Sequence, residues 1–277
     1  MKFLMEVIVL ITVKNKIMGS IYGFAIGDAI GATTEFMSEE KIKSYYGEIK
    51  DMIGGGWLNL KAGEITDDTQ MTICVMDALI NFPNDVDTFK HECAKNFLRW
   101  YLSMPKDIGC QCAKALDYFL DFGCYIPESD SALGNGSLMR AMPCALLGKT
   151  DFNVEQGKIT HNNIECSRVI QDYTRLIQNI IYNDSYIYSV NKLFEPSGYI
   201  FNTFNNAMYW SNQESFEKAI LGAVNHGGDA DTIAAITGSI VGARFGYDSI
   251  PKSWVKKLDS KIKECLEKFK SFVFSCL

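Results

Sequence analysis

Residues 19–36 read GSIYGFAIGDAIGATTEF, with a glycine at every fourth position from Gly19 to Gly31. Apolar residues recur beside this stripe at helical spacing, which predicts a helix over about 14–31. A stripe of glycines on a soluble helix allows a second backbone to approach closely, because no side chain intervenes. Asp28 lies on this apolar, small-residue helix, so a buried role in orienting other groups is an alternative to a surface position.

The same periodicity extends to most of the chain. Thr66 has the features of a helix cap, because two aspartates and an apolar run follow it. Further helices are predicted near residues 86–103, 111–121, 137–147, 163–182, 215–224, 231–246 and 254–274. Strand-like alternation is weak, and residues 182–204, rich in Asn, Tyr and Ser, are interpreted as an irregular surface excursion. These patterns predict an all-α protein with one compact domain over residues 14–277.

The N-terminal residues 1–13 form an apolar extension before that domain. The run from Phe3 to Val13 contains Glu6, is not followed by a small-residue cleavage site, and is too short to span a bilayer as a helix. We interpret it as an extra packed segment or an upstream extension, and we expect no membrane association.

Composition narrows the function classes. The chain has 277 residues, 47% of them hydrophobic, and a formal net charge of -6. Lys and Arg are scattered, so a nucleic-acid groove is not indicated. The nine cysteines form no zinc-ligand pattern, which is typical of reduced thiols in a cytoplasmic protein. We expect a monomer that binds no nucleic acid.

Two predicted helix starts carry paired acids. The first is Thr66-Asp67-Asp68, and the second follows two glycines in Gly227-Gly228-Asp229-Ala230-Asp231-Thr232. Each could be an ordinary helix cap, but a cap needs only one such group. Carboxylate and hydroxyl oxygens suit hard cations such as Mg²⁺ or Mn²⁺. Four carboxylates carry too much charge for one small cation, so we expect two ions that share an aspartate.

Three other positions are candidates for ligand binding or catalysis. The turn Gly134-Asn135-Gly136-Ser137, followed by Arg140, could hold an anion at a helix start or could simply lead into a helix. Glu35 follows a predicted helix end and could be a mobile acid/base or a solvated surface acid. His161 precedes an apolar helix, where a lone histidine is more often structural than catalytic.

In this order, the motifs resemble the ADP-ribosylglycohydrolase family, which includes bacterial dinitrogenase-reductase-activating glycohydrolases and eukaryotic ADP-ribosyl-acceptor hydrolases. The resemblance covers about residues 19–246. The matching segments are GSIYGFAIGDAIGATTEF (19–36), GGGWLNLKAGEITDDTQM (54–71), GNGSLMRAMP (134–143), ITH (159–161) and VNHGGDADTIAAITGSIVGARFG (224–246). His226 departs from many relatives, which have an apolar residue there, and should alter the rim of the site more than its metal ligands.

The resemblance implies a compact multi-helix fold with a central cleft that holds two Mg²⁺ or Mn²⁺ ions. The positions that match the family's metal ligands are Thr66, Asp67, Asp68, Asp229, Asp231 and Thr232. Glu35 matches a glutamate near the scissile bond, and Asp231 is the candidate bridging and catalytic carboxylate. The positions that match substrate-binding residues are Gly134, Asn135, Gly136, Ser137, His161 and Gly228.

The expected activity is hydrolysis of ADP-ribosylated arginine, with an ADP-ribosylated protein or a small ADP-ribose conjugate as substrate. Cleavage at C1″ of the distal ribose passes through an oxocarbenium-like state, and cations can hold the ribose diol and activate water. The alternatives are hydrolysis of O-linked ADP-ribose on serine or a small molecule, a non-catalytic relative that binds ADP-ribose, and a phosphohydrolase that cuts the diphosphate.

Overall fold

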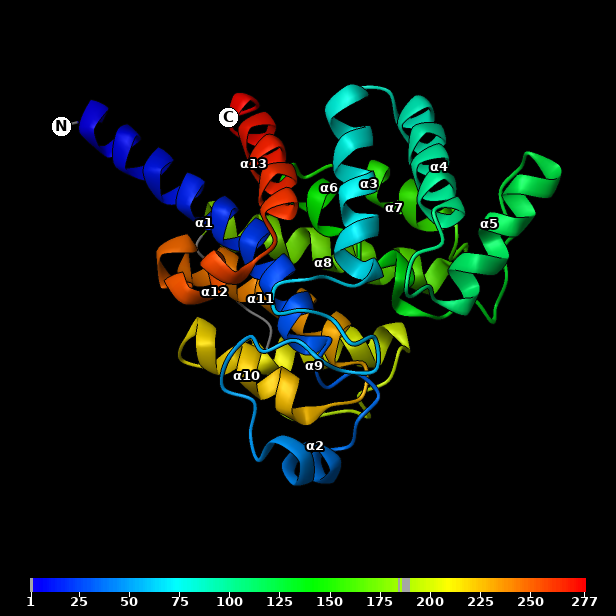
Figure 1. The fold of residues 1–277 in the computed structure, drawn as a ribbon. Coiled ribbons are helices and arrows are strands. Elements are labelled where there is room, and N and C mark those ends of the chain that lie inside the picture. Colours follow the sequence, from blue (N-terminus) through cyan, green and yellow to red (C-terminus); the bar gives the residue numbers. More distant parts are fainter. Residues whose placement is uncertain (1, 184, 186–189) are drawn as a thin grey trace.

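Helix α11 (Ala230–Phe245) and the C-terminal half of helix α1 (Lys2–Gly31) lie at the centre of the fold, and the N-terminal end of α1 projects from it (Figure 1). They pack backbone against backbone along the glycine stripe. A Cβ atom on Gly19 would lie 2.1 Å from the carbonyl oxygen of Gly242, and one on Gly23 would lie 2.2 Å from that of Gly238. Real side chains do not tolerate such distances, so the predicted close approach of a second backbone is confirmed.

The computed structural model describes residues 2–183, 185 and 190–277. Within these residues the chain is helical and contains no β-strand, which confirms the predicted all-α class. The elements other than the central pair are α2 (Glu39–Tyr46), α3 (Asp67–Asn81), α4 (Val86–Leu102), α5 (Cys110–Phe122), the 3-10 helix η1 (Asn135–Ser137), α6 (Met142–Leu146), α7 (Thr150–Lys158), α8 (Ile164–Asn183), α9 (Ile200–Trp210), α10 (Phe216–His226), the 3-10 helix η2 (Tyr247–Ser249), α12 (Lys252–Lys257) and α13 (Ser260–Ser275).

Buried hydroxyl groups tie the surrounding helices to the central pair. Ser239 of α11 shares hydrogen bonds with Ser20 of α1, at 2.8 Å, and with the hydroxyl of Tyr173 of α8, at 2.6 Å. The hydroxyl of Tyr22 of α1 donates to Glu267 of α13, at 2.7 Å. These bonds satisfy polar groups that would be costly to bury alone, and they fix the helices around the core.

Helix α1 begins earlier than the sequence predicts. It runs without interruption through the expected boundary between residues 13 and 14, so that boundary does not coincide with a break in secondary structure. The division into an extension and a single domain stays a prediction. None of the helices in the described part of the chain combines the length and apolar character that a bilayer-spanning segment requires.

Several predicted bounds were wrong. Residues 137–147 form the end of η1 and the short helix α6, and residues 254–274 are divided between α12 and α13, where Asp259 caps the second helix. Helix α9 begins inside the stretch 182–204 that was interpreted as irregular, of which residues 184 and 186–189 lie outside the described residues. Helices α2 and α7 were not predicted, because they are short and their apolar pattern is weak.

Candidate active site and metal centre

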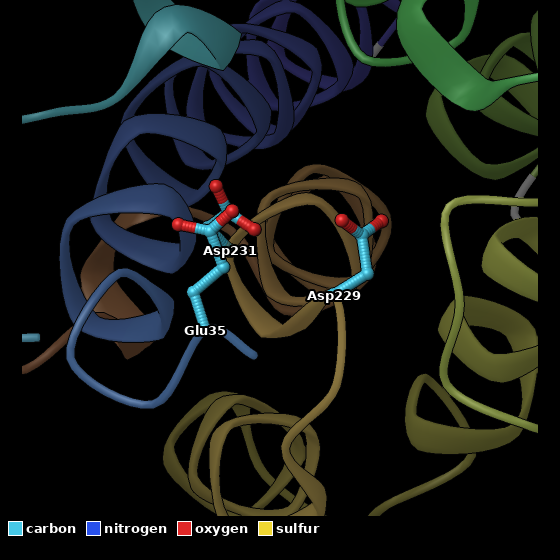
Figure 2. A group of neighbouring side chains, drawn as sticks. All are labelled: Glu35, Asp229 and Asp231. Carbon is cyan, nitrogen blue, oxygen red and sulfur yellow. The ribbon is translucent and has the colours of Figure 1, made fainter. Parts of the chain in front are cut away.

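The paired acids of both helix starts meet the loop that follows α1. Carboxylate oxygens of Glu35, Asp229 and Asp231 all lie within 4.8 Å of one another, and Figure 2 shows these three side chains. Asp67, Asp68 and Asp231 form a second group that meets the same distance limit. Asp231 therefore belongs to both groups.

A buried aspartate in α1 positions the start of α3. Asp28 accepts hydrogen bonds from the backbone N–H groups of Thr66 and Thr69, each at 3.0 Å. Thr66 caps the helix and accepts from the N–H of Asp68 at 3.3 Å. Because Thr66 and Asp28 accept from the N–H groups of Asp68 and Thr69 in the first turn, the side chains of Asp67 and Asp68 are available to the site.

The start of α11 is organised differently. Asp229 occupies the cap position, but its side chain makes no capping bond and instead accepts from the side-chain amide of Asn135. The turn before it is fixed through the backbone of Gly228, whose N–H donates to Met37 at 2.8 Å and whose carbonyl accepts from Phe36 at 2.7 Å. The Gly-Gly motif is thus joined directly to the residues that follow Glu35.

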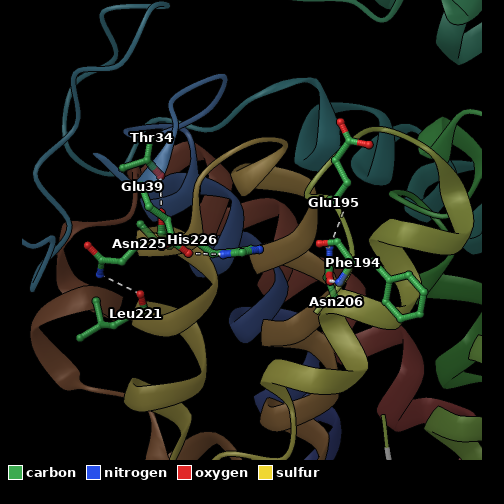
Figure 3. A network of polar contacts seen from close by, with 9 residues as sticks. Thr34, Glu39, Phe194, Glu195, Asn206, Leu221, Asn225 and His226 are labelled. Atoms are coloured by element: carbon green, nitrogen blue, oxygen red, sulfur yellow. Dashed lines mark hydrogen bonds and ion pairs between the residues drawn. The ribbon is translucent and has the colours of Figure 1, made fainter. Parts of the chain in front are cut away.

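The loop that carries Glu35 is also held in place by contacts with α10. The hydroxyl of Thr34 donates to the carbonyl of Val224 at 2.7 Å, and Nδ1 of His226 lies 2.5 Å from a carboxylate oxygen of Glu39 (Figure 3). These contacts join both sides of the loop to α10. The backbone beside Glu35 is consequently well anchored, so movement of this acid would require rotation of its side chain.

Asn206 of α9 supports the other side of the α11 start. Its side chain accepts from the N–H of Phe194 at 2.9 Å and donates to the carbonyls of Phe194 and Glu195, as Figure 3 shows for this network. The next residue, Pro196, accepts from the N–H of Asp229 at 2.9 Å. A buried amide therefore holds the segment that positions Asp229.

Burial sets the electrostatics of this site. Burial and the neighbouring carboxylates raise the pKa of Asp67 to about 8. Burial also raises the pKa of Glu35 to about 8, against a hydrogen bond from Trp57 that favours the charged form. The pKa values of Asp68 and Asp231 lie well above the ordinary range for the same reason. Repulsion between carboxylates this close together favours their protonation or the binding of cations among them.

The donor set fits hard divalent cations. Oδ2 of Asp68 and Oδ1 of Asp231 are buried and have no hydrogen-bond partner among the described residues. The other oxygen of Asp68 accepts from the hydroxyl of Thr232 at 3.3 Å. Buried oxygens without partners are costly unless an ion or water satisfies them, and oxygen-only surroundings suit Mg²⁺ or Mn²⁺.

A cavity of about 360 Å³ lies beside the acids. Most of the residues predicted for the site line it. They are Glu35, Asp67, Asp68, Gly134, Asn135, Gly136, His161, Asp229, Asp231 and Thr232. The cavity therefore joins the acid groups to the Gly134–Gly136 turn, although the motifs are far apart in the sequence.

Three predicted residues do not line the cavity. Thr66 is buried and serves as the cap of α3. Ser137 is fully buried, and its hydroxyl has no hydrogen-bond partner among the described residues. Gly228 has both backbone groups paired, and a Cβ atom there would lie 1.9 Å from the carbonyl oxygen of Pro196. The geometry gives Gly228 a role in forming the turn.

Two of the side chains that the sequence did not predict bear on the chemistry of the site. Asp107 lines the cavity, and its pKa is raised by burial. It lies between α4 and α5 without a motif, so nothing in the sequence distinguished it from other acids. The indole N–H of Trp57 donates to Glu35 at 2.8 Å. Its signal was its position directly after three glycines, which indicated a loop but no partner.

Comparisons with known proteins agree with this geometry. A sequence model of the ADP-ribosylglycohydrolase family matches residues 10–181 and 165–274. The chain is 33% identical to the ADP-ribosyl-[dinitrogen reductase] glycohydrolase of Rhodospirillum rubrum, over 91% of this chain and 93% of the relative. It is 32% identical to ADP-ribosylarginine hydrolase Tri1 of Serratia proteamaculans, over 88% of this chain and 75% of the relative.

A solved structure supports the fold independently. The protein described as an ADP-ribosylglycohydrolase-related protein complex superposes with a TM-score of 0.78 and 23% identity, covering 95% of this chain and 97% of that chain. The family match includes the two acid motifs and the Gly134–Gly136 turn, and both relatives cover most of the sequence. The chain therefore belongs to the ADP-ribosylglycohydrolase family of enzymes.

Proposed function

We propose that this protein is a metal-dependent hydrolase that cleaves the N-glycosidic bond of ADP-ribosylated arginine and releases ADP-ribose. The observation that carries the proposal is the position of Asp231, which belongs to two acid groups at the edge of one cavity. A relative named as an ADP-ribosylarginine hydrolase supports the arginine linkage, and a relative named as an ADP-ribosyl-[dinitrogen reductase] glycohydrolase supports an ADP-ribosylated protein as substrate.

The metal centre in this proposal uses residues from both helix starts. Two Mg²⁺ or Mn²⁺ ions would be held by Thr66, Asp67, Asp68, Asp229, Asp231 and Thr232, with Asp231 shared between them. Bound cations would supply positive charge that holds ribose hydroxyl groups and makes water more acidic. The buried, unpartnered oxygens of Asp68 and Asp231 support this assignment.

Hydrolysis adds water to C1″ of the distal ribose and breaks the bond from C1″ to the guanidinium nitrogen. The leaving nitrogen takes up a proton, and an acid/base residue must manage proton transfer. Glu35 is our candidate, because it lines the cavity within reach of Asp231 and receives the indole N–H of Trp57. That hydrogen bond fixes one carboxylate oxygen and leaves the other for the substrate.

The Gly134–Gly136 turn is the proposed binding site for the diphosphate and its ribose. It borders the same cavity as the acids, and Asn135 is held in place by Asp229 and by the hydroxyl of Thr203 at 3.0 Å. His161 packs against the turn. Ser137 lies behind it, where its contribution would come from the backbone or from packing.

We further propose that the enzyme acts as a monomer in the cytoplasm on an ADP-ribosylated protein or a small ADP-ribose conjugate. All nine cysteines are free thiols in the structure, which is typical of a reducing compartment.

The proposal can be tested with purified protein and two matched peptides that carry ADP-ribose on arginine or on serine. Each is assayed with Mg²⁺, with Mn²⁺ and after chelation, and the nucleotide product is identified. We expect metal-dependent release of ADP-ribose from the arginine peptide. Release from the serine peptide alone would favour the O-linked alternative. AMP as product would indicate a phosphohydrolase, and no product with intact ADP-ribose binding would indicate a non-catalytic relative.

A further inference from the structure

Arg140 is a fully buried cation whose described partners are all neutral. Its guanidinium donates to the carbonyl of Gly136 at 2.8 Å, to the side chain of Gln156 at 2.7 Å and to the hydroxyl of Thr160 at 2.7 Å. It also lies over the ring of Phe97, 4.5 Å from the centroid. Burying a cation without a carboxylate partner is costly, and these hydrogen bonds to neutral acceptors offset part of that cost.

The bond from Arg140 determines what the Thr160 hydroxyl can do. A guanidinium only donates hydrogen bonds, so the Thr160 oxygen accepts in that contact. The same oxygen lies 2.9 Å from Nδ1 of His161. The adjacent positive charge polarises the hydroxyl and makes it a better donor and a poorer acceptor. A hydroxyl polarised in this way favours donation to Nδ1 of His161, and in that arrangement Nδ1 is the unprotonated ring nitrogen.

A competing acceptor for that proton is weak. The sulfur of Cys112 is a hydrogen-bond partner of the Thr160 side chain and lies 3.9 Å from Nη1 of Arg140, but a thiol sulfur accepts hydrogen bonds poorly. An imidazole nitrogen is much the stronger acceptor. Burial and the charge of Arg140 lower the pKa of His161 to about 3, so the ring is neutral at physiological pH.

The other nitrogen of His161 faces the proposed diphosphate turn. A Cβ atom on Gly134 would lie 2.9 Å from Nε2, and one on Gly136 would lie 3.3 Å from it. His161 also lines the cavity, and no described residue forms a hydrogen bond with Nε2. With Nδ1 unprotonated, Nε2 carries the proton. The opposite tautomer would present a lone pair to an anionic ligand and repel it.

We propose that Arg140 and Thr160 are positioning residues that hold His161 as the neutral Nε2–H tautomer, so that this N–H donates to an anionic oxygen of a nucleoside diphosphate at the turn. The identity of the ligand rests on the proposed function. The tautomer rests on the hydrogen bonds of the free protein, so the two can fail separately.

The tautomer can be measured directly by ¹⁵N NMR of histidine-labelled protein without ligand. The chain contains only three histidines, so the signals can be assigned with His91→Gln and His226→Gln variants. We expect His161 to be protonated at Nε2 and to remain neutral between pH 5 and pH 8, taken as roughly the range in which an ordinary histidine titrates. An Nδ1–H tautomer, or a mixture of the two, in the wild-type protein would overturn the proposal.

Variants of Thr160 test whether its hydroxyl sets the tautomer of His161. Thr160→Val removes the hydroxyl and keeps the shape, whereas Thr160→Ser keeps the hydroxyl. We expect Thr160→Val to lose the single tautomer and to bind ADP-ribose about tenfold more weakly, as loss of one hydrogen bond to a charged group predicts. Thr160→Ser should retain both properties. An unchanged tautomer in Thr160→Val would also overturn the proposal.

A matched control separates this effect from loss of stability. Thr174 is another buried threonine, and its hydroxyl bonds to Asn153 and to Ile170 rather than to the site. Thr174→Val should leave the His161 signals and ADP-ribose affinity unchanged. If the wild-type protein has the Nε2–H tautomer but does not bind ADP-ribose, the proposed function fails. The NMR result would still support control of the His161 tautomer by Arg140 and Thr160.

Discussion

The starts of α3 and α11 both carry two aspartates and a threonine, but they are built in different ways. At α3, capping is the task of Thr66 and of the distant Asp28, and the two aspartates of the first turn face the site. At α11, the cap residue Asp229 turns its carboxylate to Asn135, and backbone bonds through Gly228 and Pro196 fix the turn. The comparison teaches that aspartates at a helix start are available to a site when other residues cap the helix, as at α3, or when the side chain at the cap position makes no capping bond, as at α11.

The largest expected effect comes from the residue shared by the two acid groups. We expect Asp231→Ala to reduce turnover by about a thousandfold or more. Mutation of a residue that only hydrogen-bonds to a metal ligand lowers metal affinity or activity by roughly 10–100-fold, and loss of a shared ligand should cost more. Calorimetric titration with Mn²⁺ should show that both ions bind more weakly. Normal activity would exclude Asp231 as a bridging ligand.

Glu35 lies outside both helix starts and provides the next test. Glu35→Gln should lower turnover by roughly a hundredfold or more, while metal and ADP-ribose binding remain, because only proton transfer is lost. The measurement is a steady-state assay beside calorimetry with ADP-ribose. Glu40→Gln is a suitable control, because Glu40 is an exposed acid on α2. A near-wild-type rate in Glu35→Gln would rule out the assigned role.

The difference in capping between α3 and α11 can be tested by measuring the stability of variants at each helix start. Asp28→Ala leaves the N–H groups of Thr66 and Thr69 buried without partners, and should lower the free energy of unfolding by about 2–4 kcal/mol. Asp229→Ala removes no capping bond and should change it by less than about 1 kcal/mol. Urea unfolding of the metal-free proteins measures both. Equal losses would show that the two starts do not differ as described.

The raised pKa values predict how pH affects the metal-free protein. The folded-state pKa of Asp67 and of Glu35 is about 8, above the ordinary carboxylate value. The folded state therefore binds more protons, so this contribution to stability is complete below about pH 4 and is lost as pH rises through about 8. We expect the melting temperature of chelated protein to fall between pH 5.5 and pH 8, both values chosen to lie within roughly that window. Saturating Mg²⁺ or Mn²⁺ should reduce this fall, because the cations offset the repulsion between carboxylates.

The smallest effect is expected at Ser137. Its hydroxyl is buried behind the Gly134–Gly136 turn, so Ser137→Ala should raise KM a few-fold and leave kcat nearly unchanged. Michaelis–Menten analysis on the arginine-linked peptide checks this. A large loss of kcat with constant KM would mean that the hydroxyl acts in the transition state.

Much of the fold could be predicted because its main signals are local. The glycine stripe predicted the close packing of α1, and the paired acids predicted two helix starts. The sequence did not show that α11 is the partner of α1, since that pairing depends on contacts between distant segments. The sequence also did not predict α9. Asn206 in this helix is a weak helix former, and its buried side chain is stabilised there by hydrogen bonds to Phe194, which is distant from it in the sequence.

The candidate site shows the same limit. Residues in motifs, such as Asp68 and Asp231, could be identified from their neighbours in the sequence. Asp107 and Trp57 could not, because Asp107 reaches the cavity and Trp57 reaches Glu35 from loops whose paths are set by packing. Ser137 shows the reverse case, since a motif residue can be buried behind the surface that its neighbours form.

The pairing of α1 with α11 has a consequence for synthesis of the chain. The glycine stripe of α1 emerges from the ribosome early, but Gly238 and Gly242 follow more than two hundred residues later. At a translation rate of about 5–20 residues per second, the interval is on the order of ten seconds or more. During that time the apolar surface of α1 lacks its native partner and is exposed to chaperones and to other nascent chains.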